Sequence, residues 1–218
     1  APTVTRLRLP THGGPFTLYG IEPAPGVTCR PPKADELPGR RMLAYGTSIT
    51  HGSASPEPEL TYAGLAAYHL QADLINLGAG GSAHCEYELA DYIAGRDDWD
   101  FATLALSVNM QGFTQEEFRS RTGYMVKTVA GAHPDKPVFA ITLWPYFRDV
   151  GILDGDEPTP SDLSEARRLA QRMRQDLRDS VTAAGCANLH LLEGPELFGP
   201  FSGLTADLIH PGPLGMMT

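Results

Sequence analysis

The stretch RMLAYGTSITHG, residues 41–52, joins an apolar run to a glycine turn and then to residues that can begin a helix. The run at residues 42–45 has no polar side chain at alternate positions, which is typical of a strand buried on both faces of a sheet. Gly46 lets the backbone turn sharply. The serine that follows, Ser48, either caps a helix or presents its hydroxyl at the strand end, close to helix N–H groups. The stretch alone leaves both alternatives open.

The same pattern of strand and helix repeats along the rest of the chain. Four further apolar runs predict buried strands at residues 72–77, 101–108, 138–143 and 187–192. Between the strands, helical periodicity predicts helices at residues 61–71, 85–94, 114–130 and 161–184. Five strand–helix units in sequence predict an α/β fold, with a mostly parallel sheet covered by helices on both faces. Ligands of such folds bind beyond the carboxyl ends of the strands.

The last predicted helix carries many charged side chains, and we expect them to form a solvated face. They are Arg167, Arg168, Arg172, Arg174, Asp176, Arg178 and Asp179. The whole chain is acidic, with 17 basic and 26 acidic residues and a net charge of −9. A general nucleic-acid binder needs a basic face, so this class of function is disfavoured.

The first forty residues differ from the rest. Residues 7–9 and 16–21 form short extended-looking pieces, and residues 23–38 are rich in proline, glycine and charge, which indicates a linker. We therefore divide the chain into an N-terminal extended segment and linker, residues 1–40, and a main domain, residues 41–218. The first segment is either the tail of a preceding domain or an arm packed on the main one.

Other classes are excluded by what the chain lacks. No apolar run approaches the ~18 residues of a membrane helix, and the first ten residues contain no apolar signal-peptide core. We therefore expect no membrane contact and a cytoplasmic location, although a start at Ala1 is compatible with a trimmed chain. The cysteines Cys29, Cys85 and Cys186 are widely spaced and indicate neither a disulfide framework nor a zinc site.

Polar residues follow the remaining predicted strands. Residues 76–81, NLGAGG, contain three glycines in four positions, which lets backbone approach a ligand closely. Asn109 follows the third strand, where it either forms a turn or donates to a developing oxyanion. Asp207 precedes His210 by three residues, a spacing that can hold the imidazole in one tautomer. Together with Ser48, these residues are the set required for acyl transfer through a serine ester.

In this order the residues resemble the SGNH hydrolase superfamily, also called GDSL esterases and lipases. Four blocks match over residues 41–218: residues 46–50, residues 76–81, Asn109, and residues 207–211. Thr47 stands where the family has an Asp, and Asn109 lacks the Gly-x-Asn-Asp context. The resemblance implies a three-layer α/β/α sandwich of the flavodoxin-like type, with about five strands and a last helix cut short at Thr218.

The resemblance also implies roles for single residues. Ser48, Asp207 and His210 would be catalytic, and the oxyanion would bind to the N–H groups of Ser48 and Gly81 and to the amide of Asn109. No cofactor and no metal would be required. Further candidates for binding substrate are His51, His84, Trp144 and Tyr146. The alternatives are exposed histidines and, for the two aromatic residues, an exit loop packed on the core.

The variants at residues 46–52 and 76–84 resemble a bacterial subgroup that carries a β-sandwich before the catalytic domain. This subgroup includes an acyltransferase that decorates an aromatic polyketide. We therefore expect a serine esterase acting on a small O-acyl ester, an acetylated sugar or a natural product. Two alternatives stay open: an acyltransferase that uses the same residues on a small-molecule hydroxyl, and a non-catalytic ligand-binding module. The sequence determines neither the acyl and alcohol groups nor the oligomeric state.

Overall fold

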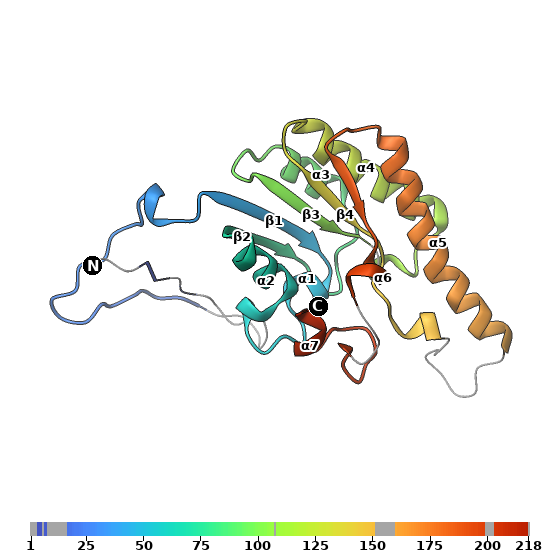
Figure 1. Cartoon of the computed structure of the whole chain (residues 1–218), viewed down its shortest axis with the longest axis horizontal. Helices are drawn as coiled ribbons and strands as arrows, with labels where there is room; N and C mark the ends of the chain where they lie inside the picture. Colours follow the sequence, from blue (N-terminus) through green and yellow to red (C-terminus); the bar gives the residue numbers. More distant parts are fainter. Residues whose placement is uncertain are drawn as a thin grey trace.

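The computed structural model describes residues 4, 5, 7, 17–106, 108–150, 160–198 and 203–217. Within these residues, five strands form one sheet in the order β2-β1-β3-β4-β5, and every pairing is parallel (Figure 1). The strands are β1 (Arg40–Gly46), β2 (Ala72–Gly78), β3 (Phe101–Ala105), β4 (Val138–Ile141) and β5 (Leu189–Leu192). The predicted α/β fold with a five-stranded sheet is confirmed, and the strand order is that of flavodoxin-like folds.

Helices cover both faces of the sheet. On one face lie α3 (Tyr87–Ala94), α4 (Gln115–Ala132) and α5 (Pro160–Ala184), whose buried side chains share a large core cluster with β1, β3, β4 and β5 (Figure 1). On the other face, α2 (Tyr62–His69) packs on β1 and β2 through a smaller cluster of Met42, Ala44, Ala63, Ala67 and Ala72. The three-layer arrangement expected from the resemblance is therefore present.

Short elements follow the carboxyl ends of the strands. They are α1 (Ser48–His51), η2 (Pro58–Leu60), η3 (Val108–Met110), η4 (Phe147–Val150), α6 (Gly194–Leu197) and α7 (Pro213–Met216). Another 3-10 turn, η1 (Ala34–Glu36), precedes β1. Of the helices in the described part of the chain, none is both long and apolar enough to span a membrane.

Two strands end earlier than the sequence predicts. The predicted strand at 101–108 ends at Ala105, and the one at 138–143 ends at Ile141. The residues beyond them stay buried, because Leu106, Val108 and Leu143 are at most 6% exposed. An apolar run indicates that its residues are buried, whether or not they belong to a strand. Buried loop residues after β3 and β4 therefore make the apolar runs longer than the strands themselves.

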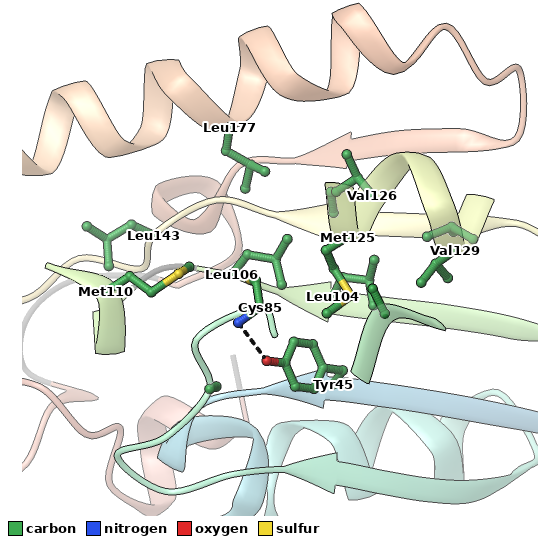
Figure 2. Packing of buried hydrophobic residues seen from close by; sticks show 14 of the residues in the cluster. Tyr45, Cys85, Leu104, Leu106, Met110, Met125, Val126, Val129, Leu143 and Leu177 are labelled. Carbon is green, nitrogen blue, oxygen red and sulfur yellow. Dashed lines mark hydrogen bonds between the residues drawn. The ribbon is translucent and has the colours of Figure 1, made fainter. Parts of the chain in front are cut away.

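The larger core surrounds Tyr45, which points from β1 toward the chain at Cys85, in a cluster that includes Leu104 and Met125 (Figure 2). The Tyr45 hydroxyl accepts a hydrogen bond from the Cys85 backbone N–H at 3.1 Å and donates one to Glu86 Oε2 at 3.4 Å. Burial raises the pKa of Tyr45 and the pKa of the Cys85 thiol well above their ordinary values. Since the thiolate is the reactive form of cysteine, Cys85 is a core residue and not a nucleophile.

The expectation of a fully solvated charged face on α5 is wrong for two residues. Arg174 is 2% exposed and Asp176 is 3% exposed. Each has partners from other elements: Arg174 binds Asp149 beside β4, and Asp176 accepts a hydrogen bond from Gln115 of α4. Both α4 and η4 contact α5, so charges on more than one of its faces are covered.

The described part of the N-terminal segment carries no strand before β1, which begins at Arg40, and residues 17–35 are exposed. Residues 17–35 extend away from the sheet (Figure 1). The pieces at residues 7–9 and 16–21 lie partly outside the described residues. The division at residue 40 and the preceding β-sandwich stay predictions.

Gly78, at the end of β2, packs directly against the turn that carries α1. A Cβ atom here would lie 2.2 Å from the backbone N of His51 and 2.5 Å from its Cα. Because backbone cannot move aside as a flexible side chain does, we expect Gly78→Ala to lower the free energy of unfolding by about 3 kcal/mol. Urea denaturation of the two proteins measures this difference.

Gly131→Ala in α4 is the matched control, since a Cβ there meets no atom within 4 Å. Helix propensity predicts that this second substitution stabilises the protein by ~0.5–1 kcal/mol. Equal stability of Gly78→Ala and the unchanged protein would contradict the close packing of β2 on the α1 turn.

Candidate active site

Ser48 lies just beyond the carboxyl end of β1, as the first residue of α1. The turn before it is tight, because a Cβ on Gly46 would lie 2.2 Å from Thr50 Oγ1. The side chain of Thr47, and not that of Ser48, caps α1 by accepting the Ile49 N–H at 3.4 Å. The Ser48 hydroxyl is therefore free to bind another partner. Ser48 itself is 9% exposed.

That partner is His210, far along the chain. Ser48 Oγ lies 2.7 Å from His210 Nε2, and His210 Nδ1 lies 2.6 Å from Asp207 Oδ2. A carboxylate only accepts hydrogen bonds, so the network assigns the imidazole proton to Nδ1 and leaves Nε2 as the acceptor for the serine O–H. The three side chains form one continuous hydrogen-bonded chain.

A tight loop orients the carboxylate of Asp207. Its Oδ1 accepts the backbone N–H groups of Ile209 at 2.9 Å and His210 at 3.0 Å, and the hydroxyl of Thr205 at 2.7 Å. The Thr205 N–H in turn donates to the His210 carbonyl at 2.8 Å. With Oδ1 held in this way, Oδ2 faces the imidazole.

The same contacts set the charge of Asp207. Its partial burial favours the neutral acid, but hydrogen bonds from the His210 ring, from the His210 and Ile209 N–H groups and from Thr205 outweigh that effect. They hold the pKa of Asp207 well below its usual range. Asp207 is therefore a carboxylate at any pH near neutrality.

The glycine-rich segment after β2 docks on the Ser48 turn. Asn76 Nδ2 donates to the Thr50 carbonyl at 2.8 Å, and the Ala79 N–H donates to the Gly46 carbonyl at 2.8 Å. A Cβ on Gly80 would lie 3.9 Å from Ser48 Cβ. Gly81 has a left-handed φ of 71°, and a Cβ there would meet no atom within 4 Å. The backbone of this segment therefore passes close to Ser48 with open space on one side.

A hydrogen bond with Ala83 determines the orientation of the Asn109 side chain, which lies in η3. Its Oδ1 accepts the Ala83 N–H at 3.2 Å. An N–H must face the amide oxygen, so the Nδ2 group points the other way and has no acceptor within the described part of the chain. The amide oxygen therefore joins η3 to Ala83, 26 residues earlier in the chain, and does not close a local turn, while the other end of the amide is left as a donor. The role of this donor toward an oxyanion stays a prediction.

A family model described as the GDSL-like lipase/acylhydrolase family matches residues 39–218. The chain belongs to this family. No curated protein sequence matches it. The predicted resemblance to the GDSL esterases and lipases is thus confirmed at the level of the family.

Solved structures that resemble the chain in fold include the following three. A protein described as a GDSL-like lipase, from Bacteroides ovatus, is 24% identical with a TM-score of 0.68, over 82% of this chain and 49% of that one. A salicylyl-acyltransferase of a tetracycline biosynthetic pathway is 22% identical with a TM-score of 0.60, over 82% and 51%. A family two carbohydrate esterase from Cellvibrio japonicus is 15% identical with a TM-score of 0.56, over 83% and 58%. The chain therefore spans about half the length of the first two, and the likeness at these identities is one of fold.

The four further candidates for binding substrate in this GDSL-family chain differ from one another in their contacts. The ring of His51 lies beside Gly80, since a Cβ on that glycine would be 3.5 Å from His51 Nδ1. His84 Nδ1 lies 3.8 Å from Glu86 Oε1. Trp144 is half-buried against Tyr62, with ring centroids 5.3 Å apart. Tyr146 is buried beside Phe147. Their roles toward substrate stay predictions.

Two residues that hold the site together were missed at the level of sequence. Thr205 orients Asp207, and Asn76 ties the glycine-rich segment to the Ser48 turn. A threonine two residues before an aspartate fits a local turn, and this was the one available signal for Thr205. Among the described residues, no group of three or more His, Cys, Asp or Glu side chains is arranged to hold a metal ion.

Proposed function

We propose that the protein is a serine esterase that cleaves a small O-acyl ester through an acyl-enzyme intermediate. The observation that carries the proposal is the continuous chain of hydrogen bonds from Ser48 Oγ through His210 to Asp207. Membership of a family of lipases and acylhydrolases supports it. A non-catalytic ligand-binding module has no need of such a chain at the carboxyl edge of the sheet.

In the first half of the reaction, Ser48 Oγ attacks the ester carbonyl carbon while His210 Nε2 takes its proton. Asp207, a carboxylate throughout, stabilises the imidazolium. When the tetrahedral intermediate collapses, the alcohol oxygen leaves with the proton from His210, and the acyl group remains on Ser48. In the second half, water attacks the acyl carbon while His210 Nε2 takes its proton. When this second tetrahedral intermediate collapses, the bond to Ser48 Oγ breaks, His210 returns the proton to Ser48, and the carboxylic acid is released.

The charge on the tetrahedral oxygen requires donors at the carboxyl edge of the sheet. The candidates are the backbone N–H groups of Ser48 and Gly81 and the Nδ2 group of Asn109. None of the three has an acceptor among the residues that the structure describes. Each such donor contributes ~2.7–4 kcal/mol to lowering the barrier of acyl transfer.

Acyl transfer to a small-molecule hydroxyl is the second candidate function, since one structural neighbour is a salicylyl-acyltransferase. The two functions share the acyl-enzyme and differ in whether water or an alcohol removes the acyl group. An acetylated sugar as substrate is supported by the likeness in fold to a carbohydrate esterase.

The test is turnover of short p-nitrophenyl esters with and without added sugar or phenolic alcohols, with the products separated by mass. We expect free acid as the main product. A transferred ester as the main product would favour the acyltransferase. Absence of both turnover and labelling of Ser48 by a fluorophosphonate probe would overturn the proposal and favour a binding module.

Asn109 offers a second test, because its two functions can be separated. Asn109→Asp keeps an oxygen for the Ala83 N–H but replaces the free donor with a negative oxygen. We expect kcat to fall by ~10²–10³ in Asn109→Ala and by at least as much in Asn109→Asp, with KM nearly unchanged, because the oxyanion forms only in the transition state.

The melting temperatures of the two Asn109 variants complete this prediction. Asn109→Asp should melt closer to the unchanged protein than Asn109→Ala does, because only the aspartate retains an acceptor for the Ala83 N–H. Intact turnover in Asn109→Ala together with a large loss of stability would show that Asn109 only joins η3 to the segment at Ala83.

A further inference from the structure

Arg174 is a buried arginine on α5 with an unusually complete set of partners. Its guanidinium binds both carboxylate oxygens of Asp149, at 2.6 Å and 2.8 Å. It also donates to the carbonyls of Leu143 at 2.8 Å and Trp144 at 3.2 Å. One side chain therefore connects both ends of the segment at residues 143–149, which leaves the carboxyl end of β4.

Hydrogen bonds also link residues within that segment. The Tyr146 N–H donates to Asp149 Oδ2 at 3.1 Å, and the Asp149 N–H donates to the Tyr146 carbonyl at 2.9 Å. A buried ion pair has a large desolvation cost, so its contribution to stability over an apolar pair of equal size is small. Its directional bonds, in contrast, determine where this backbone lies.

The segment then contacts the loop that carries Asp207 and His210. The Phe147 N–H donates to the Leu208 carbonyl at 2.9 Å. Leu208 has a left-handed φ of 54°, a conformation that is unfavourable for a residue with a Cβ and persists only where neighbours impose it. Its N–H donates to the Thr205 carbonyl at 2.9 Å, so among the hydrogen bonds of the described residues it is the one from Phe147 that reaches Leu208 from outside its own loop.

We propose that Arg174 is a positioning residue for catalysis: through Asp149 and the Phe147–Leu208 hydrogen bond, it sets the distance of His210 from Ser48. The inference rests on the proposed serine esterase function. A reacting group displaced by about 1 Å can cost ~10² in rate. Loss of this link should therefore reduce kcat while leaving KM, which does not depend on the His210 position, almost unchanged.

Arg178 provides a matched control one turn further along α5. It also forms a bidentate pair, with Glu193 at 2.6 Å and 2.9 Å, and Glu193 accepts the Thr142 hydroxyl. None of the described hydrogen bonds of this pair reaches residues 204–211. A lysine at either position keeps the positive charge and loses the planar two-pronged geometry.

The experiment compares Arg174→Lys with Arg178→Lys for kcat, KM and melting temperature on a p-nitrophenyl ester. We expect kcat to fall ~10–100-fold in Arg174→Lys and less than about twofold in Arg178→Lys. Equal kcat values for the two variants would overturn the inference, as would a KM effect alone. An unchanged protein that neither turns over esters nor reacts with a fluorophosphonate would instead refute the proposed function.

A second pair of variants isolates the hydrogen bond to Leu208 in case Arg174→Lys does not fold. Phe147→Pro removes the ring and the N–H, whereas Phe147→Ala removes the ring alone, and proline suits the first position of a 3-10 turn. We expect kcat of Phe147→Pro to be ~10-fold or more below that of Phe147→Ala. Equal kcat values would show that this bond does not position His210.

Discussion

Replacing Ser48 with alanine is expected to lower kcat by ~10⁵–10⁶, the largest effect of any single substitution in this chain. The hydroxyl is the group that His210 Nε2 contacts at 2.7 Å, and no other nucleophile can form the acyl-enzyme at that position. The alanine should leave stability nearly unchanged, because Thr47 and not Ser48 caps α1. Steady-state kinetics and thermal melting on the same sample measure both quantities.

A fluorophosphonate probe provides the direct check on Ser48. The serine oxygen displaces fluoride at phosphorus, and peptide mapping should place the adduct on Ser48. Ser55→Ala is the control, since the Ser55 hydroxyl donates to the Glu57 carbonyl in an outer loop and its loss should not change turnover. An adduct on another residue, or turnover that survives in Ser48→Ala, would exclude Ser48 as the nucleophile.

Asp207→Asn is expected to lower kcat by ~10³–10⁴. The asparagine oxygen can still accept the Ile209 and His210 N–H groups, so the loop should keep its shape. Its NH₂ group would then face His210 Nδ1, which forces the proton onto Nε2. In that tautomer the imidazole cannot accept the proton of Ser48. An effect below about tenfold would show that Asp207 does not orient His210.

The lowered pKa of Asp207 adds a stability test to the same variant. A carboxyl whose folded pKa is below its unfolded value, ~3.9, stabilises the fold above that value and loses this contribution as pH falls through the folded pKa. The stability advantage of the unchanged protein over Asp207→Asn should therefore be constant near neutrality and shrink below about pH 4. An advantage that grows as the pH falls would contradict the assigned hydrogen bonds.

Much of the fold was predictable because buried strands appear in the sequence as short apolar runs. A strand covered on both faces must be apolar at successive positions, so all five strands appear as apolar runs in the sequence. The same pattern extended the third and fourth predicted strands too far, since Leu106 and Leu143 are buried although they lie beyond the ends of β3 and β4. On α5 the opposite error arose, because charge alone did not indicate that Arg174 and Asp176 are covered by other elements.

The sequence by itself determined which residue types stand at the strand ends, because turn, cap and strand preferences act over a few neighbouring residues. It also determined the family, through the order of four short blocks. Only the tertiary structure decided that Ser48 meets His210 across 162 positions, that Ala83 orients the amide of Asn109, and that Arg174 faces inward toward Asp149. Each of these depends on the order and stacking of β1, β3, β4 and their helices, since a hydrogen bond between distant residues requires the packed sheet and core to bring its two atoms together.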